Sequence, residues 1–259
     1  MLDCPDLEAP ADDATIWRIM DVPRLLAILA GRSLFLPRAS ALGDEHEGAF
    51  PPHQPPLDRA LDLIPPAWRA SAIRVKTSPG LLELGRNLRD WVYVSCWYVA
   101  QHESAALWTL YGHGQGVAIR STVGRFRKAI GPITPFRPDV QVFALQPQVG
   151  AVRYVDYAAV RFDARHPLLP FFHKRLEYEA EREFRLVCAF LPIRNGVVDF
   201  NGHNAWPGVA AAADLDELIE SVWFAPETPD WQVETLTRIL PTFNVGAPTH
   251  ASVCAFSEF

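Results

Sequence analysis

The chain has few lysines and no excess of positive charge. Among its 259 residues only three are lysine, and Asp plus Glu outnumber Lys plus Arg by 30 to 24, which gives a formal net charge of -6. A protein that binds nucleic acid through bulk electrostatics needs a basic surface. The composition argues against that mode of binding and leaves only a local basic patch open.

Cysteines are also few and widely spaced. Cys4, Cys96, Cys188 and Cys254 form no CxxC pair, and two of them lie within apolar runs. This pattern predicts buried free thiols in a reducing compartment.

Long hydrophobic runs are missing as well. The sequence contains no stretch of about 18 apolar residues, the length that a membrane helix needs. The acidic segment 1–13 has neither the basic nor the apolar region of a signal peptide. We therefore expect a soluble, cytoplasmic protein without membrane contacts. Its hydrophobic content of 49% is enough for a substantial core.

Prolines, 23 in number, punctuate the chain, and no internal repeat interrupts it. Residues 1–14 are predicted to form a loose tail and residues 15–259 a single domain. Runs of β-branched and aromatic residues indicate strands, whereas apolar residues at helical spacing indicate helices. The two kinds of segment interleave irregularly, which favours one α+β domain with a mixed or antiparallel sheet flanked by helices.

The boundaries of these elements follow from the same patterns. Strands are expected at residues 33–40, 91–100, 116–122, 140–157 (with a turn), 183–192, 221–226 and 251–256. Helices are expected at residues 16–31, 67–90, 104–114, 166–181 and 229–240, with a long Pro-rich loop at 41–66.

One candidate site lies in the segment 92–122. Ser95 is on a strand that is followed by a helix, a glycine turn and another strand. The aromatic side chains Trp97, Trp108 and Tyr111 line a pocket if this unit binds a ligand, and fill the core if it does not. The sequence leaves both interpretations open.

Two loops offer weaker signals. Arg38 follows an apolar strand, where an arginine can hold a phosphate with two hydrogen bonds or can simply be a solvated strand end. The loop 43–48, GDEHEG, has enough oxygen ligands for a divalent cation but no EF-hand spacing, so a solvated acidic loop is the simpler interpretation. The segment 112–116, GHGQG, does not match GxGxxG and is a weak nucleotide signature.

Glutamates at every second position form the last candidate, in LEYEAEREFRLV. If the chain is extended here, Glu181 and Glu183 share one face with Arg185. Such residues either form a surface salt-bridge network or hold a carboxylate beside a substrate, where it stabilises a developing positive charge. Arg185 would keep its neighbouring carboxylate ionised and lower its pKa.

Taken in order, these motifs resemble the bacterial domain family DUF2971 over roughly residues 16–190. The family combines an acidic loop, a Ser-Cys-Trp strand, a Trp-x-x-Tyr helix before a glycine, and a lysine followed by a Glu-rich stretch that ends in arginine. The chain keeps Asp44 and Glu47 of the loop but lacks its proline and phenylalanine. Leu107 stands where methionine is common. The family name implies no activity. The resemblance suggests a bacterial toxin or phage-defence role.

The order of motifs also resembles the ADP-ribosyltransferases of the Arg-Ser-Glu type, which implies an ADP-ribosyltransferase-like core and NAD as the cofactor. Arg38 would then grip the NAD phosphates, Ser95 would brace the nicotinamide pocket, and Glu183 would bond the ribose 2′-hydroxyl, with Glu181 as the upstream glutamate. Four further residues would contact the nucleotide: Trp97, Trp108, Tyr111 and Arg185. The acceptor of ADP-ribose could be a protein, a nucleic acid or a small molecule, and the resemblance implies no metal.

Two other classes of function stay open. Acidic side chains could converge on Mg²⁺ or Mn²⁺ in a nuclease or phosphodiesterase. The candidates are Asp44, Glu47, Glu181 and Glu183, with His46, His102 and His113 as possible additions. Alternatively, the chain is a binding or regulatory module in which these residues brace a surface.

Overall fold

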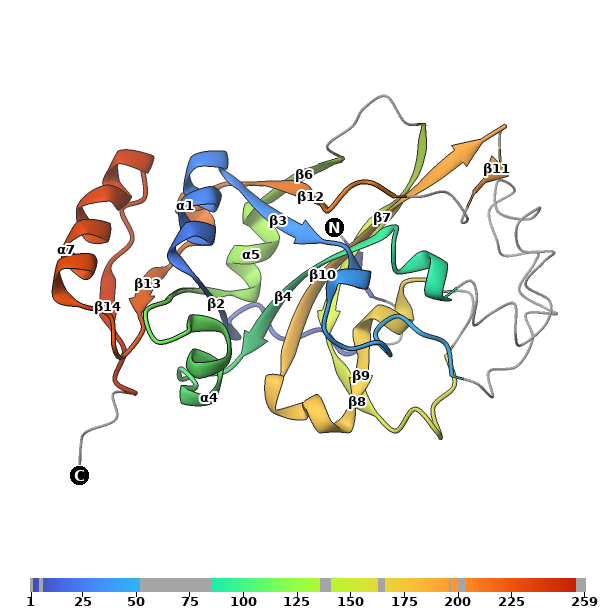
Figure 1. Cartoon of the computed structure of the whole chain (residues 1–259), viewed down its shortest axis with the longest axis horizontal. Coiled ribbons are helices and arrows are strands. Elements are labelled where there is room, and N and C mark those ends of the chain that lie inside the picture. The colour runs from blue at the N-terminus through green and yellow to red at the C-terminus, as the bar shows by residue number, and fades with distance from the viewer. Residues whose placement is uncertain are drawn as a thin grey trace.

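A large mixed sheet runs through the molecule (Figure 1). The computed structural model describes residues 2–4, 7–51, 85–135, 141–162, 166–195, 197–199 and 204–254. Within them the sheet has nine strands in the order β1-β7-β10-β4-β2-β5-β13-β14, with β11 added to β10. They are β1 (Leu2–Asp3), β7 (Val142–Ala151), β10 (Glu183–Arg194), β4 (Val92–Val99), β2 (Thr15–Met20), β5 (Val117–Thr122), β13 (Ser221–Phe224), β14 (Thr249–Ala251) and β11 (Val197–Val198). The β1–β7 and β13–β14 pairs are parallel and the other pairs are antiparallel, which confirms the predicted mixed α+β class.

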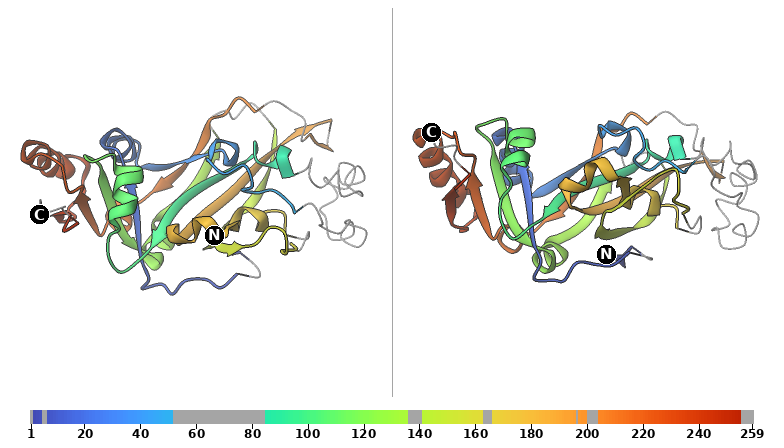
Figure 2. Two further views of the ribbon diagram at one scale, coloured as in Figure 1. Left: turned by 60° about the horizontal axis from the view of Figure 1, so that its bottom comes forward. Right: turned by 90° about the horizontal axis from the view of Figure 1, so that it is seen from below.

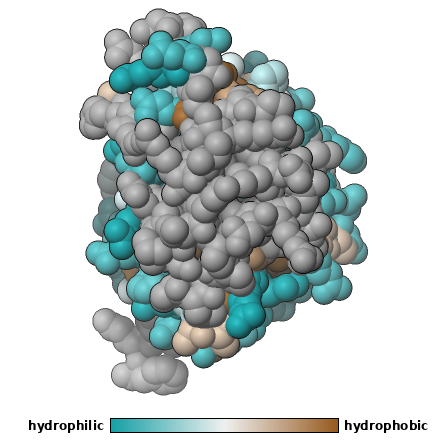
Figure 3. All heavy atoms as spheres, turned by 90° about the vertical axis from the view of Figure 1, so that its right-hand side faces the viewer, coloured by the Kyte–Doolittle hydropathy of each residue, from teal (hydrophilic) through white to brown (hydrophobic). Residues whose placement is uncertain are grey.

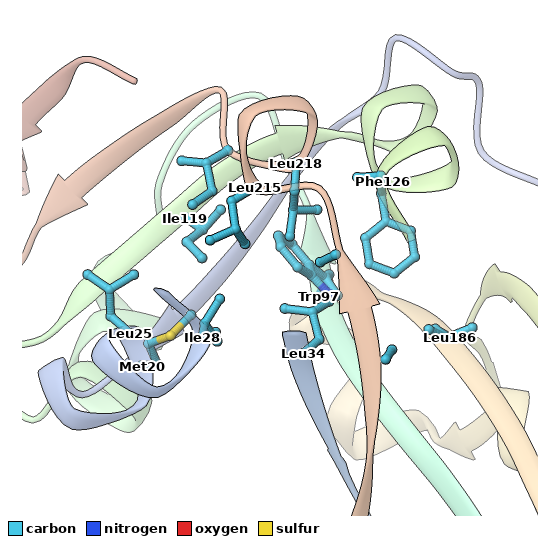
Figure 4. Close-up of a cluster of buried hydrophobic side chains, with 14 of the residues drawn as sticks. Met20, Leu25, Ile28, Leu34, Trp97, Ile119, Phe126, Leu186, Leu215 and Leu218 are labelled. Atoms are coloured by element: carbon cyan, nitrogen blue, oxygen red, sulfur yellow. The ribbon is translucent and has the colours of Figure 1, made fainter. Parts of the chain in front are cut away.

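A second sheet covers one face of the large sheet. It pairs β3 (Ser33–Pro37), β12 (Gly208–Ala213) and β6 (Ile130–Pro135) antiparallel. Leu34 of β3 packs in one apolar cluster with Trp97 of β4 and Leu186 of β10. Helices α1 (Val22–Gly31), α5 (Val123–Ala129) and α6 (Leu215–Leu218) contribute to the same cluster, shown in Figure 4. This core fixes β4 and β10 side by side.

The opposite face of β4 and β10 carries shorter elements. These are the 3₁₀ turn η4 (Leu169–Phe172), the parallel pair β8 (Arg153–Val155) and β9 (His173–Arg175), and the 3₁₀ turn η5 (Leu176–Glu181). Phe171 and Phe172 pack there with Val94 and Val187. In the left view of Figure 2 these yellow and gold segments lie below β4 and β10, while β3 and β12 lie above them.

The helix predicted over residues 16–31 is wrong in its first part, because Thr15–Met20 is the strand β2. Its β-branched residues pair with β4 and β5, and the hydrophobic spacing alone could not distinguish this from a helix. The helix begins after Asp21, whose carboxylate accepts a hydrogen bond from the backbone N–H of Arg24 at 2.8 Å. The helix ends at the C-cap residue Arg32, which is in the left-handed conformation with φ 43°.

The helix predicted over residues 166–181 is also wrong. Two 3₁₀ turns flank the short strand β9, which pairs with β8. Pro170 lies in η4, and the buried Phe171 and Phe172 anchor that turn against the sheet. Arg182, with φ 41°, ends η5 and turns the chain into β10. Tertiary packing has therefore overridden the helical pattern.

Most other predicted strands are present. They include β3, β4, β5, β7, β10 and β13, and the predicted C-terminal helix is α7 (Asp230–Ile239). The last strand, β14, comes slightly earlier than the predicted 251–256. Leu2 and Asp3 pair with β7, so this part of the predicted loose tail is attached to the sheet. The predictions for residues 52–84 lie outside the described residues.

The helix predicted at residues 104–114 is short and irregular. It consists of α4 (Ala105–Leu107) followed by the π-helical turn η3 (Trp108–Gly112).

Figure 3 shows the face at the right-hand side of Figure 1, where the described residues at the margin are mostly hydrophilic. None of the described helices is long and apolar enough to cross a membrane.

Candidate functional site

A cavity of about 660 Å³ opens where β2 and β4 separate. The two strands pair only at Ile16 with Val99 and at Trp17 with Tyr98. Beyond these pairs they diverge, and side chains from both strands line the space. The π-turn η3, the 3₁₀ turn η5 and the loop after η1 (Ala39–Ala41) complete its wall. The cavity thus lies between the two halves of the large sheet.

A buried cluster of opposite charges forms one end of this cavity. The Nζ of Lys174 lies 2.5 Å from Glu181 Oε2, 2.8 Å from Glu183 Oε1 and 3.1 Å from Glu47 Oε1. The guanidinium of Arg185 donates to Glu183 Oε2 at 2.6 Å and to Glu47 Oε1 at 3.1 Å. Three carboxylates therefore face two cations.

The start of β10 brings two of these carboxylates to the cavity. Because η5 ends at Glu181 and the chain turns at Arg182, Glu183 can enter the sheet directly opposite Tyr98 of β4. The hydroxyl of Tyr154 accepts a hydrogen bond from the Glu183 backbone N–H at 2.8 Å, which fixes this turn. Glu177 and Glu179 are exposed. The glutamate run is therefore divided between solvent and the cavity.

The two cavity glutamates differ in ionisation. Burial raises the pKa of Glu181 to about 7, and the neighbouring carboxylate of Glu183 contributes further to this rise. Burial also acts on Glu183, but the charge and hydrogen bonds of Arg185 outweigh it and hold the pKa of Glu183 well below its usual range. One carboxylate is a fixed anion, and the other exchanges a proton near neutral pH.

The oxygens of Glu181 also accept fewer hydrogen bonds than those of Glu183. Both oxygens of Glu183 accept from Arg185, and Oε1 accepts from Lys174 as well. On Glu181, Lys174 takes Oε2, while Oε1 has only a 3.3 Å bond from the hydroxyl of Tyr111. The Glu181 side chain is 14% exposed and that of Glu183 is 7% exposed. Glu181 is therefore the carboxyl group more available to a ligand.

An arginine that the sequence analysis missed lies at the other side of the cavity. Arg18 of β2 donates to Ser95 Oγ at 2.9 Å and to the carbonyl of Phe35 at 3.3 Å, and its guanidinium carbon lies 5.8 Å from the Trp97 ring. These partners carry no charge. Burial lowers the pKa of Arg18 to about 10, so the guanidinium is still charged at pH 7. Arg18 could have been recognised from the sequence only as an arginine on a strand. The helix predicted over residues 16–31 hid that signal.

The structure separates several predicted site residues. Arg38 donates to the carbonyl of Asn204 at 2.8 Å and does not line the cavity. Ser95 points to the face of β4 shared with Trp97, because neighbouring strand residues alternate, whereas Cys96 lies opposite Arg185 on the carboxylate face.

The aromatic candidates also divide. Trp97 and Tyr111 line the cavity. Trp108 does not; its indole N–H donates to Glu103 Oε2 at 2.7 Å, and the ring borders a separate cavity of about 240 Å³. Arg185 and Glu181 line the main cavity together with Glu183.

The acidic side chains proposed for a metal are paired with cations. Asp44 forms an ion pair with Arg175 at 3.2 Å, and Glu47 is held by Lys174 and Arg185. Across the described ranges, no three His, Cys, Asp or Glu side chains are grouped in a way that could hold a metal ion. The donor set therefore does not support the metal-dependent alternative.

The loop that carries Glu47 depends on a glycine. Gly48 has φ +73°, and a Cβ there would lie 2.2 Å from a ring carbon of the buried Phe171. We expect Gly48→Ala to lower the free energy of unfolding by about 2–4 kcal/mol, from the left-handed backbone and overpacking together. Urea unfolding measures this, with Gly43→Ala as control, since a Cβ at Gly43 would have no neighbour within 4 Å. Equal losses in both variants would contradict the prediction.

Comparison with known proteins adds little. No family model and no curated protein matches the sequence, so the resemblance to DUF2971 stays a prediction. Among solved structures, the chain is similar to Thermus sp. 2.9 DarT in complex with ADP-ribosylated ssDNA. The identity is 13%, the match covers 95% of this chain and 97% of that chain, and the TM-score is 0.39. A likeness at this level carries no argument about activity.

Proposed function

We propose that this chain is an ADP-ribosyltransferase-like enzyme that binds NAD in the cavity between β2 and β4 and cleaves its nicotinamide–ribose bond. One observation carries the proposal. The strand with Arg18, the strand with Ser95 and the strand that begins at Glu183 are consecutive neighbours in the sheet, and the cavity lies where the first two separate. The order Arg18, Ser95, Glu183 supports the proposed Arg-Ser-Glu assignment, in which Arg18 replaces Arg38 as the arginine.

The charges of the cavity match the charges of NAD. The dinucleotide has an anionic pyrophosphate and a cationic nicotinamide ring. Arg18 has no carboxylate partner among the described residues and is suited to the pyrophosphate. Glu181 and Glu183 are suited to the nicotinamide riboside, and Trp97 and Tyr111 supply aromatic walls. A single bound molecule would satisfy both regions.

The two glutamates would have separate roles in the reaction. When the bond between nicotinamide N1 and ribose C1′ breaks, its electron pair goes to nicotinamide, which leaves as a neutral molecule. The ribose becomes oxocarbenium-like, and the fixed negative charge of Glu183 stabilises it. Glu181 accepts the proton of the attacking nucleophile, which forms the new bond to C1′. The nucleophile is water in glycohydrolysis, or an acceptor on a protein, a nucleic acid or a small molecule in transfer.

The test of this proposal is calorimetric titration with NAD in EDTA, together with chromatographic measurement of released nicotinamide. Binding in the micromolar to millimolar range with turnover supports the proposal. The absence of both binding and nicotinamide release refutes it and returns attention to the binding-module alternative. A toxin or phage-defence role depends on this activity and on the acceptor.

We expect Arg18→Gln to weaken NAD binding by about 10- to 100-fold, because it removes a charge-assisted hydrogen bond to phosphate. Arg38→Gln is the matched control and should bind NAD like the wild type, since Arg38 is tied to Asn204 outside the cavity. Calorimetry of both variants measures the difference. The reverse result would restore Arg38 as the phosphate ligand.

A further inference from the structure

Glu47 has a carboxylate oxygen that nothing in the described structure satisfies. Its side chain is 2% exposed and lines the cavity beside Glu181 and Glu183. Oε1 accepts a hydrogen bond from Arg185 at 3.1 Å and forms an ion pair with Lys174 at 3.1 Å, whereas Oε2 is buried with no hydrogen-bond partner. A buried, unpaired carboxylate oxygen is costly, and such groups are uncommon in native proteins.

The conformation of Glu47 is fixed by its surroundings. The Glu47 backbone N–H donates to the Asp44 carbonyl at 3.2 Å, and the next residue, Gly48, packs against the ring of Phe171. Lys174 and Arg185 then hold the carboxylate from the other side. The unpaired oxygen is therefore part of a rigid arrangement, and a rotation of the side chain would break two ion pairs.

The charge of the cluster limits what can approach this oxygen. Above about pH 7, where Glu181 has lost its proton, the three carboxylates outnumber the cations Lys174 and Arg185 by one negative charge. It would repel a phosphate or carboxylate and would favour a group that donates a hydrogen bond.

We propose that Glu47 is a specificity-determining residue whose Oε2 accepts a hydrogen bond from an O–H or N–H donor of the nicotinamide riboside end of NAD. This inference rests on the proposed function. The donor is either the ribose 2′-hydroxyl or the carboxamide N–H, and both belong to the same part of the ligand. Glu47 would thereby distinguish NAD from nucleotides that lack this donor.

The experiment is a cycle that combines variants of the protein with variants of the ligand. Glu47→Gln can keep the Oε1 acceptor for Lys174 and Arg185 while replacing Oε2 by an N–H₂ group that opposes the ligand donor. We expect NAD binding to weaken by about 10- to 100-fold. The control is Glu45→Gln, the same chemical change on an exposed side chain of the same loop, which should bind NAD like the wild type.

Two NAD analogues then identify the donor. The 2′-deoxyribose analogue lacks the hydroxyl, and the 3-acetylpyridine analogue replaces the carboxamide N–H₂ by a methyl group. The proposal expects one analogue to bind the wild type about 10- to 100-fold more weakly than NAD and to show little or no further loss with Glu47→Gln. Independent, additive losses for both analogues would overturn it.

The outcomes distinguish failure of the proposed function from failure of the role of Glu47. If the wild type binds no NAD, the proposed function fails, and the role of Glu47 fails with it. If the wild type binds NAD and Glu47→Gln binds it equally well, only the role of Glu47 is wrong. If Glu47→Gln does not fold, the test uses the wild type alone. The proposal requires at least one of the two analogues to bind the wild type more weakly than NAD, and equal binding of both would overturn it.

Discussion

Glu181→Gln is expected to reduce the rate of nicotinamide release by about 10²- to 10⁴-fold, the range in which a positioned acid or base contributes to catalysis. The amide is nearly the same size and can still accept from Lys174, so the cavity keeps its shape. It cannot take up a proton from a nucleophile. NAD binding should therefore persist while turnover is lost, which calorimetry and chromatography of the same preparation would measure.

The pH dependence of the rate gives an independent signature. Burial raises the pKa of Glu181 to about 7, and the proposed base acts in its ionised form. The rate of nicotinamide release should therefore rise with pH and level off above about pH 7. Glu183 contributes no inflection in this range, because Arg185 holds its pKa well below the usual value. In Glu181→Gln the inflection should disappear from the residual activity.

Glu179→Gln is the matched control for Glu181. It makes the same chemical change in η5, two residues earlier, on an exposed side chain. Its rate and pH profile should equal those of the wild type. If Glu181→Gln also retains full activity, the proton-accepting group is another residue, and the assignment of Glu181 is wrong.

The site was partly predictable because its acidic half is local in sequence. Glu183 and Arg185 are two positions apart on β10 and therefore share one face, and Glu181 is brought beside them by the turn at Arg182. Glu47 and Lys174 join them through tertiary contacts, between a loop near the N-terminus and β9. No local pattern encodes that distance.

The cationic half was missed for a specific reason. The apolar residues of segment 16–31 satisfy both a helix and a strand followed by a helix, and periodicity does not locate the boundary. Asp21, a good N-cap residue, marks that boundary in the structure. Once Thr15–Met20 is a strand, Arg18 becomes the strand arginine, whereas Arg38 lies after β3 in the other sheet. One error in secondary structure therefore moved the candidate arginine from Arg18 to Arg38.

The strands were predicted better than the 3₁₀ turns. β4 and β10 are rich in buried aromatic and β-branched residues that only a central strand accommodates. The segment 166–181 has a helical composition, but it is held in turns by the packing of Phe171 and Phe172 and by the pairing of β9 with β8. Such contacts are non-local, so a local sequence pattern does not reveal them.

Arg185→Met is expected to lower the free energy of unfolding by about 3–5 kcal/mol, the usual loss when one partner of a buried ion pair is removed. The Arg185 side chain is 1% exposed, and its guanidinium also donates to the carbonyl of Phe171 at 2.8 Å. Methionine fills much of the volume but leaves Glu183 and Glu47 dependent on Lys174 alone. Urea unfolding at constant pH measures the loss.

Arg194→Met is the control on the same strand. Its side chain is 75% exposed and its ion pair with Asp199 is at the surface, so the change should stay within about 0.5 kcal/mol. A loss of similar size in both variants would show that the buried cluster has no special role in stability.

The double variant Glu183→Leu/Arg185→Met distinguishes two causes of the stability loss in Arg185→Met. One is the lost attraction between Arg185 and Glu183, and the other is the buried charge of Glu183 that is no longer neutralised. If Arg185 stabilises the fold mainly by neutralising Glu183, removing both charges should recover part of the stability that Arg185→Met loses. Lys174 would then still face Glu47 and Glu181, so one cation would neutralise one of the two remaining carboxylates, and Glu181, with its pKa of about 7, can take up a proton. Additive losses in the double variant would mean that the two residues act on stability independently. Packing and hydrogen bonds to the backbone would then hold the cluster together. Neutralisation by Arg185 would no longer explain why Glu183 stays ionised.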